Sequence, residues 1–427
     1  MAVNTSESYR ELVMYSVFVR NYSEEGTFEG VRKDLDRIKA LGVDIIWMLP
    51  IHPVGKKARK GTLGSPYAIS DYRGINPEFG TPDDFRRLVA AIHERGMKCV
   101  IDVVYNHTSP DSWLAVNHPE WFYHKPDGSF GNRIGDWSDV IDLDYGNKEL
   151  WDYQIETLKM WAEIVDGFRC DVAPLVPLEF WLRARREVEE VRPGCFWLCE
   201  SVEPEFITAT RAQGMASLSD AELYQAFDAA YEYDIYDSFR GCLTGKNTLE
   251  RYAGDICRQE YIYPENYVKL RFLENHDRPR AAFLLPDEGR LLAWTAFVYF
   301  QKGMTLIYAG QEKGVKHLPS LFDADRVQWD TGRDFSALMS RLHEIKKDPL
   351  FARSSYEVRA LPGGVLMASH SSGGRRCVGI FPVSGGSALV DAALPDGLYT
   401  DLISGDTVEV HAGMVAVDGR AVIINIS

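Results

Sequence analysis

The stretch Val165-Asp166-Gly167-Phe168-Arg169-Cys170-Asp171 has the composition of a short buried β-strand. Its β-branched, aromatic and small apolar residues suit the interior of a sheet. Side chains two positions apart on a strand point to the same face, so Arg169 and Asp171 are expected side by side. A guanidinium beside a carboxylate favours the ionised acid. Such a pair is either a structural ion pair or a carboxylate nucleophile held in its charged form, and the heptapeptide alone leaves both open.

Strand-like and helix-like patterns alternate on both sides of this stretch. Helical patterns cover 28–41, 82–95, 148–163 and 178–191, and Thr81 with Pro82 makes a suitable start for the second of them. This alternation predicts parallel strands joined by crossover helices. Eight strands in a chain of this length favour a (β/α)₈ barrel over an open doubly wound sheet. The eight runs with strand character are 12–19, 43–49, 97–105, 165–171, 195–200, 226–233, 268–274 and 304–308.

Two segments depart from this rhythm. Residues 108–147 carry aromatic residues, Pro, Gly and Asp without a clear period, and they are long for a loop, so we expect a small inserted subdomain after the third strand. Toward the C-terminus, short alternating runs are separated by Gly-Gly, Ser-Gly and Asp-Gly turns, which predicts an antiparallel β-sandwich. The expected division is a (β/α)₈ barrel at 1–107 and 148–350, the insert at 108–147 and the β-domain at 351–427.

Composition argues against several classes of protein. The formal net charge of −15 argues against a nucleic-acid partner, and no run approaches the roughly 18 apolar residues of a membrane span. The seven cysteines lack a close-set framework and several lie in apolar runs, as expected of reduced thiols. The first residues lack the basic and apolar regions of a secretory signal. We expect a cytoplasmic protein, with a trimmed secreted form as the alternative. Nothing in the sequence indicates the oligomeric state.

Charged and polar residues follow four of the predicted strands where each ends. These endings are Asp102-Val103-Val104-Tyr105-Asn106-His107, Arg169-Cys170-Asp171, Phe196-Trp197-Leu198-Cys199-Glu200 and Phe272-Leu273-Glu274-Asn275-His276-Asp277. A barrel brings the carboxyl ends of its strands to one rim, which is where barrel enzymes carry their active sites. Four such endings together indicate an active site. The residues expected to meet there are Asp171, Glu200, Asp277, His107, His276 and Arg169.

These motifs resemble those of the α-amylase family of glycoside hydrolases. The resemblance runs from the first strand to the terminal β-domain, with motifs at 102–107, 167–171, Glu200 and 275–277 and a weaker match at 141–144. It implies that Asp171 is the nucleophile and Glu200 the general acid/base. It also implies that Asp277 is a third acid, which holds the sugar hydroxyls and stabilises the distorted ring.

The resemblance extends to residues around these acids. It implies that His107 and His276 hydrogen-bond the sugar at the cleaved bond and that Tyr67 stacks on that sugar. Arg169 would orient Asp171, with Asp102 as a support for Arg169.

A structural calcium is a further expectation from the resemblance, because Asn106 matches a position that binds calcium in many relatives. The acids of the insert that could complete the site are Asp136, Asp139 and Asp142, although a solvated acidic turn is the alternative. No cofactor is expected to be required for catalysis.

The chain departs from the starch-cleaving pattern after Asp171. Many relatives carry a Lys-His pair three and four residues beyond the nucleophile, where this chain has Pro174 and Leu175. These motifs therefore do not define how the chain binds the sugar on the acceptor side of the cleaved bond. The Lys- and Gly-rich loop at 55–66 is either a mobile lid or a charged surface loop. Residues expected to be solvated loop acids are Glu203 and Glu205, and residues that either stack on sugars or pack the insert are Trp113, Trp121 and Trp137.

The chemistry can be argued from the carboxyl groups themselves. A retaining glycosidase places its two carboxyls about 5 Å apart. At that separation two charges repel by roughly 3 kcal/mol, or about two pKa units, which would help keep Glu200 protonated while Arg169 keeps Asp171 ionised. We therefore expect retaining hydrolysis of α-1,4-glucosidic bonds in starch or maltodextrins through a covalent glycosyl-enzyme intermediate.

Two alternatives remain at this point. A 4-α-glucanotransferase or another transglycosylase would use the same acids and pass the sugar to a hydroxyl group instead of water. A catalytically inactive carbohydrate-binding or scaffold barrel would belong to another class, and the presence of all three acids argues against it.

Overall fold

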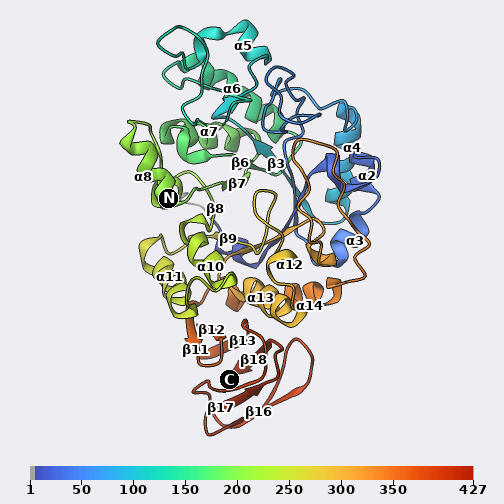
Figure 1. Ribbon diagram of the computed structural model, residues 1–427, viewed down its shortest axis with the longest axis vertical. Helices are drawn as coiled ribbons and strands as arrows, with labels where there is room; N and C mark the ends of the chain where they lie inside the picture. The colour runs from blue at the N-terminus through green and yellow to red at the C-terminus, as the bar shows by residue number, and fades with distance from the viewer. Residues whose placement is uncertain (1–4, 136, 427) are drawn as a thin grey trace.

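The structure is a computed structural model that describes residues 5–135 and 137–426. Within these ranges eight parallel strands close into a barrel, which confirms the expected (β/α)₈ architecture (Figure 1). Each strand pairs with the next in parallel register, and β1 pairs with β10 to close the ring. The barrel strands are β1 (Val13–Val17), β2 (Ile45–Met48), β3 (Lys98–Val103), β6 (Gly167–Cys170), β7 (Phe196–Cys199), β8 (Ala229–Tyr231), β9 (Lys269–Arg271) and β10 (Met304–Tyr308).

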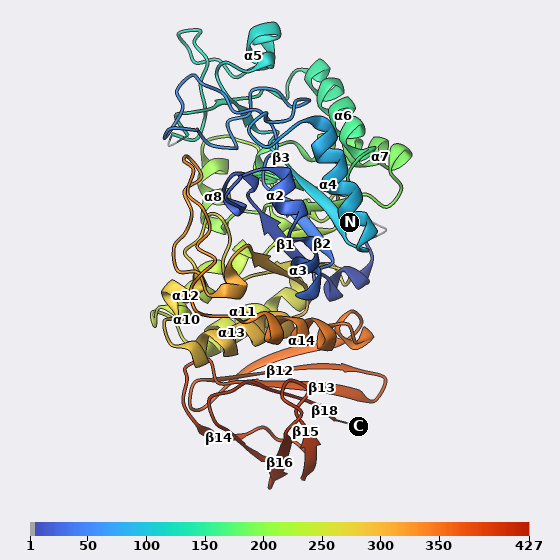
Figure 2. The ribbon, with the colours of Figure 1, turned by 90° about the vertical axis from the view of Figure 1, so that its right-hand side faces the viewer.

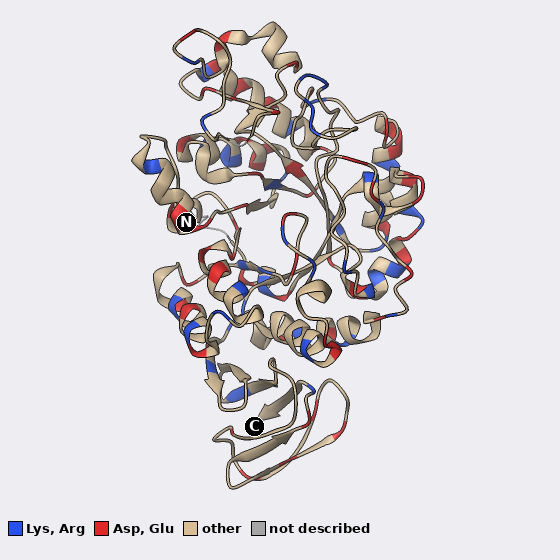
Figure 3. Ribbon diagram, in the orientation of Figure 1, with Lys and Arg blue, Asp and Glu red and all other residues tan. Residues whose placement is uncertain are grey.

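Helices cover the outside of the barrel. The helix α4 (Pro82–Glu94) begins as its sequence predicts, because Thr81 and Asp84 cap each other's backbone and Pro82 takes the first helical position. Charges of both signs are interspersed on α4 and on α11, as on a solvated surface (Figure 3). The other helices around the barrel are α1 (Val19–Tyr22), α6 (Lys148–Ala162), α7 (Leu178–Val191), α8 (Pro204–Ala212), α9 (Asp220–Leu223), α10 (Tyr236–Leu243), α11 (Leu249–Ile262), α12 (Ala281–Leu284), α13 (Glu288–Phe300) and α14 (Ser336–Lys346).

The single helix predicted over 28–41 is wrong: the segment forms α2 (Phe28–Arg32) and α3 (Leu35–Ala40). The break lies at Asp34, whose backbone has φ −105° and ψ 4°. Its carboxylate accepts a hydrogen bond from Arg37 Nε at 3.0 Å and another from the Tyr22 hydroxyl. The contact with Tyr22, which comes from α1, draws Asp34 out of the helical path, and the sequence pattern does not reveal it.

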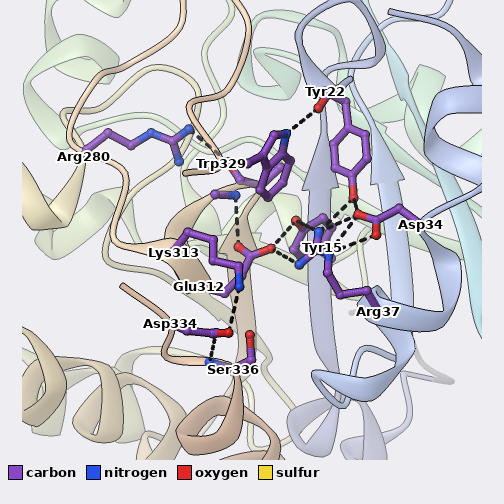
Figure 4. Close-up of polar contacts among 12 residues, drawn as sticks. Tyr15, Tyr22, Asp34, Arg37, Arg280, Glu312, Lys313, Trp329, Asp334 and Ser336 are labelled. Atoms are coloured by element: carbon purple, nitrogen blue, oxygen red, sulfur yellow. Dashed lines mark hydrogen bonds and ion pairs between the residues drawn. The ribbon is translucent and has the colours of Figure 1, made fainter. Parts of the chain in front are cut away.

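A polar network around the buried Glu312 lies behind the point where the barrel closes (Figure 4). Glu312 follows β10 and accepts hydrogen bonds from the Tyr15 hydroxyl on β1 and from Arg37 Nη1, both at 2.7 Å. Its second oxygen accepts the N–H of Gly310 at 3.0 Å. Arg37 also binds Asp34 at 2.7 Å. We call Tyr15, Asp34, Arg37 and Glu312 the seam network, because it ties the first strand to the turn after the last.

The insert and the terminal domain lie at opposite ends of the molecule, with the barrel between them (Figures 1 and 2). In the insert β4 (His107–Thr108) and β5 (Ile141–Asp142) form a two-stranded antiparallel sheet, accompanied by α5 (Trp113–Asn117) and the short 3₁₀ helix η2 (Pro119–Trp121). The expected insertion after the third barrel strand is therefore confirmed.

The terminal domain consists of two four-stranded antiparallel sheets, as predicted. Apolar side chains from both sheets, such as Val378 and Val415, pack in one core. The domain contacts the barrel through the rings of Phe300 and Phe381, whose centroids are 5.4 Å apart. The limits expected at 107, 147 and 350 stay predictions. The strands of the two sheets are β11 (Ser355–Leu361), β12 (Val365–Ser372), β13 (Arg375–Phe381) and β18 (Val422–Ile426), and β14 (Ala388–Asp391), β17 (Met414–Val417), β16 (Thr407–His411) and β15 (Gly397–Thr400).

All seven cysteines lie among the described residues, and each is a free thiol. None of the helices formed by residues 5–135 and 137–426 combines the length and the hydropathy needed to cross a bilayer. The cytoplasmic location stays a prediction.

Candidate active site

Arg169 gathers three carboxylates at the carboxyl end of the barrel. Its Nη1 lies 2.8 Å from Asp102 Oδ1 and 2.8 Å from Asp171 Oδ1. Its Nη2 lies 2.9 Å from Glu200 Oε1. Asp102 and Arg169 are register partners on β3 and β6, and the N–H groups of Asp171 and Glu200 still bond to the neighbouring strands at 2.8 and 3.0 Å. We call these four residues the acid cluster, and the rigid barrel sets their positions.

The residue after Asp171 fixes Glu200. Val172 N–H donates to Glu200 Oε2 at 2.8 Å. Val172 adopts φ 38° and ψ 42°, a left-handed conformation that is strained for a β-branched side chain. This turn aims the N–H of Val172 at Glu200, so the segment that carries Asp171 also orients the second carboxyl.

Asp277 joins the acid cluster through His276 and Tyr67. His276 Nε2 lies 3.0 Å from Asp277 Oδ2 and 2.7 Å from the Tyr67 hydroxyl. That hydroxyl donates to Asp102 Oδ2 at 3.1 Å. The Tyr67 and His276 rings stack with centroids 5.6 Å apart and planes inclined by 13°. The predicted site residues from β3, β6, β7, the segment after β9 and the loop after β2 therefore converge.

His107 stands on the insert side of Asp171. Its Nε2 is 3.9 Å from Asp171 Oδ2, too far for a hydrogen bond. Its ring centroid is 5.2 Å from that of Trp137. Burial lowers the pKa of His107 to about 4, so the ring is neutral at neutral pH.

One cleft of about 450 Å³ exposes part of this assembly. Its lining includes Tyr67, His107, Asp171, Glu200 and Asp277. Behind this lining lie three residues that are at most 2 % exposed: Asp102, Arg169 and His276. The two sets differ in what they can do, because the first can contact a bound molecule directly and the second positions the first.

Burial sets the pKa values of the two central carboxyls. It raises the pKa of Glu200 to about 8, against the attraction of Arg169 and with a smaller contribution from the charge of Asp171. It also raises the pKa of Asp171 to about 6 in spite of Arg169. Arg169 lowers the pKa of Asp171 as expected, but burial outweighs this attraction and leaves the pKa of Asp171 above its ordinary value. The order still holds: Asp171 ionises before Glu200.

Asp277 behaves differently from the other two acids. Burial opposes its ionisation, but His276, Arg169 and Arg278 together hold the pKa of Asp277 below its ordinary value. Asp277 is consequently the fixed negative charge of the cleft.

Glu203 and Arg278 are cleft residues that sequence reasoning missed. The prediction of Glu203 as a solvated loop acid is wrong, because it forms an ion pair with Arg278 and both side chains line the cleft. The Arg278 guanidinium also packs over the rings of Tyr233 and Tyr236, at 4.5 and 4.4 Å from their centroids. One signal was present: both residues lie within three positions of a predicted catalytic acid.

The loop at 55–66 forms a wall of the cleft. The N–H groups of Lys56 and Lys57 bind Asp111 Oδ2 at 2.9 and 3.0 Å. Farther along, Leu63 N–H bonds to the carbonyl of Phe322 at 2.9 Å. These bonds tie both ends of the loop to neighbouring segments, and the two alternatives, a mobile lid and a charged surface loop, stay predictions.

The residues around Asn106 make contacts with other partners. Its Nδ2 lies 3.2 Å from His107 Nδ1, Asp139 is paired with Lys60 at 2.9 Å, and Asp142 Oδ2 accepts the N–H of Arg133 at 2.7 Å. Over the described ranges no three His, Cys, Asp or Glu side chains are grouped to hold a metal ion. Calcium requires six to eight oxygen ligands. Asp136 lies outside the described residues, and calcium stays a prediction that these contacts do not favour.

Comparison with known proteins places the chain in a family. The family model for the catalytic domain of α-amylase matches residues 15–120 and 110–359, and the model for the C-terminal domain of bacterial α-amylase matches 357–424. The chain belongs to the α-amylase family. The chain is similar to an α-amylase from Lactobacillus plantarum whose crystal structure is known. The two sequences are 49 % identical, the structures superpose with a TM-score of 0.97, and the alignment covers 99 % of this chain and 100 % of that one.

Two curated relatives are longer than this chain. The α-amylase MalA of Haloarcula japonica is 28 % identical over 417 residues, which cover 92 % of this chain and 58 % of MalA. The α-1,4-glucan:maltose-1-phosphate maltosyltransferase of Pseudomonas aeruginosa is 33 % identical over 377 residues, which cover 78 % of this chain and 53 % of the transferase. The chain thus spans little more than half the length of either relative.

Proposed function

We propose that this chain is a retaining glycoside hydrolase that cleaves α-1,4-glucosidic bonds in starch fragments and maltodextrins. The observation that carries the proposal is the placement of Asp171 and Glu200 on one guanidinium at one cleft, with pKa values of about 6 and about 8. Between these values one carboxyl is ionised and the other protonated, which is the pair of states that a double displacement needs. The substrate class is supported by the names of the relatives.

The first step uses both carboxyls. Asp171 attacks the anomeric carbon through Oδ2, which has no bond to Arg169 and lies toward His107. Glu200 gives its proton to the departing oxygen, which takes the electron pair of the broken C–O bond. The products of this step are a glycosyl ester on Asp171 and a shortened glucan.

The second step reverses the roles. Glu200, now ionised, takes a proton from water while the water oxygen attacks the anomeric carbon. Asp171 leaves as a carboxylate. Two inversions at the same carbon retain the α-configuration.

The other site residues have supporting roles in this proposal. Asp277 and neutral His107 hydrogen-bond the sugar hydroxyls, and the Tyr67 ring stacks on the sugar. Arg169, Asp102 and His276 act from behind the cleft, and we propose that they hold the reacting carboxyls in place. His276 was expected to touch the sugar, and its burial supports a positioning role instead.

A 4-α-glucanotransferase is the second candidate. Val172, next to Asp171, and Val202, two positions after Glu200, pack in an apolar cluster. The cluster also holds Leu175, Phe206 and Trp137. Val172, Val202, Phe206 and Trp137 also line the cleft. Apolar walls next to the glycosyl ester favour a sugar ring over a loosely held water as the acceptor. The match to a maltosyltransferase supports the same candidate.

Incubation with pure maltotriose tests both candidates. Hydrolysis predicts glucose and maltose with no longer product, and proton NMR should show the α-anomer first. Products longer than maltotriose would show that the chain is a transferase and not a hydrolase. The β-anomer appearing first would contradict the retaining mechanism, and failure to act on maltotriose, starch and pullulan alike would contradict the proposal as a whole.

A further inference from the structure

The three tryptophans of the insert have three different surroundings. Trp121 is buried, with 4 % of its surface exposed, and Trp137 lines the catalytic cleft. Trp113, at the start of α5, is 46 % exposed. Figures 1 and 2 show α5 at the end of the molecule farthest from the terminal β-domain. We propose that the exposed face of Trp113 is the platform of a second α-glucan-binding site, outside the catalytic cleft; the ligand class rests on the proposed function.

The Trp113 ring is held rigidly. It stacks on the ring of Tyr153 from α6, with centroids 5.7 Å apart and planes inclined by 13°. Arg73 packs over Tyr153 with its guanidinium carbon 4.1 Å from the ring centroid, and its Nε donates to the hydroxyl of Thr157 at 3.0 Å. Arg73 and Trp113 thus both pack against the Tyr153 ring. A ring fixed in this way loses little conformational freedom when a ligand binds.

The backbone under Trp113 is fixed as well. Its N–H donates to the carbonyl of Ser70 at 2.8 Å, and its own carbonyl accepts a hydrogen bond from Asn117 Nδ2 at 2.8 Å. The ring is therefore exposed by a well-bonded local structure and not by a loosely held helix end.

The chemistry of the patch suits a pyranose ring. The C–H groups on one face of a glucose unit pack against an aromatic π-surface, and its hydroxyls need polar partners around the edge. The neighbouring polar residues are the exposed Asn117 and the pair formed by His118, whose ring centroid is 5.6 Å from that of Trp113, with the exposed Glu120 at 3.3 Å. A protein partner is a poorer match, because a stable interface buries about 800 Å² on each side around an apolar centre. Here the exposed apolar residues on α5 are Trp113 and Val116.

The platform lies close to the catalytic cleft. Ser70, which bonds the Trp113 N–H, is three residues from Tyr67 in the cleft lining. Three residues span at most about 11 Å. A polymer held at Trp113 would raise the effective concentration of its own chain at the acids, without any new contact in the cleft.

Adsorption to insoluble starch granules tests the site. The assay uses an Asp171→Asn background so that the granules are not degraded, and compares Trp113→Ala with Trp113→Phe. An aromatic stacking contact of this kind is worth about 1 kcal/mol, so Trp113→Ala should raise the apparent Kd for granules about five- to tenfold, and Trp113→Phe should keep most of the binding. Tyr261→Ala removes a ring on α11 that is 76 % exposed and is the matched control, expected to bind as the parent does.

A second readout separates this site from the cleft. With Asp171 intact, Trp113→Ala should hydrolyse maltotriose with unchanged kcat/KM and granular starch more slowly. Equal adsorption of Trp113→Ala and the parent would overturn the inference while leaving the proposed function standing. A parallel loss on maltotriose would place Trp113 in the catalytic site, and a change of oligomeric state in size-exclusion chromatography would make it a contact between copies; either result also overturns the inference. If the wild-type chain acts on no glucan, the proposed function itself fails.

Discussion

The acid cluster and the seam network both place carboxylates around one arginine, and they differ in how completely the buried carboxylates are hydrogen-bonded. In the seam network Glu312 receives three hydrogen bonds, from Tyr15, Arg37 and Gly310. In the acid cluster Arg169 is divided among three acids, and Asp171 Oδ2 has His107 only at 3.9 Å. We expect the first arrangement to stabilise the barrel. In the second, burial raises the pKa of Asp171 to about 6 and that of Glu200 to about 8.

This difference predicts opposite consequences of removing an acid. Asp171→Asn should abolish the nucleophile and lower kcat on maltotriose on the order of 10⁴-fold or more. The melting temperature should stay the same or rise, because the ionised form of a buried acid with a raised pKa opposes folding. Calorimetry and initial rates on the same preparation check both parts. Full activity of Asp171→Asn would remove this residue from the mechanism.

Glu200→Gln should lower activity less, by about 10² to 10⁴-fold, as expected when general acid–base catalysis is lost. The loss should shrink for an α-glycosyl fluoride, because fluoride leaves without a proton. Rates on maltotriose and on the fluoride, measured in parallel, check this. An equal loss on both substrates would contradict the assignment of Glu200 as the proton donor.

Glu312→Gln, in the seam network, should instead lower stability and leave activity unchanged. The substitution removes the charged acceptor at the buried end of the pair, while Arg37 keeps Asp34, and should lower the free energy of unfolding by about 2 kcal/mol, as for a lost hydrogen bond to a charged group, with kcat/KM of the folded enzyme unchanged. Urea unfolding measures this change. Glu29→Gln is the control, because its ion pair with Arg32 has the same 2.7 Å length but is exposed to solvent. It should have no measurable effect on unfolding, and an equal loss for both variants would remove the distinction drawn for the seam.

The pH dependence follows from the pKa values of the two central acids. Asp171 must be ionised, so kcat/KM should fall as pH drops below about 6, and Glu200 must be protonated, so it should fall as pH rises above about 8. Because the folded-state pKa of Glu200 is raised, its contribution to stability is lost as pH rises through about 8. The melting temperature of wild type should therefore fall more between pH 6 and pH 9 than that of Glu200→Gln. A flat activity profile across this window would contradict the assignment.

Glu203→Gln should have the smallest effect. Its ion pair with Arg278 is about one-quarter exposed on each side, and such a pair is worth roughly 1 kcal/mol. Releasing Arg278 from this partner should raise KM for maltotriose a few-fold and leave kcat nearly unchanged. Steady-state kinetics check the split, and a large fall in kcat with constant KM would show that Glu203 acts on the chemical step.

Much of the fold could be predicted because its signals are local. The helix at 178–191 and the strand at 304–308 have the observed limits of α7 and β10, since the first is a 14-residue amphipathic pattern and the second a short, fully buried run. The prediction of one helix at 28–41 failed because Asp34, at the break, is bonded to Tyr22 in another element, a contact that no periodicity encodes.

The site was predictable to the extent that it sits at strand ends. Asp102, Arg169, Asp171 and Glu200 meet because adjacent parallel strands are in register. Two features could not be read in this way. The partner of Glu203 is 75 residues away, and the raised pKa of Asp171 depends on how deeply the folded chain buries three acids around one guanidinium.

The central claim is that Asp171 forms a covalent bond to the sugar while Glu200 handles the proton. Glu200→Gln treated with α-maltosyl fluoride tests it most directly, because the fluoride leaves without an acid and the ester then lacks the base that resolves it. Digestion and mass spectrometry should find one glycosyl group on the peptide that carries Asp171. A glycosyl group on the peptide with Asp277, or no adduct while wild type releases fluoride from the same compound, would contradict the account.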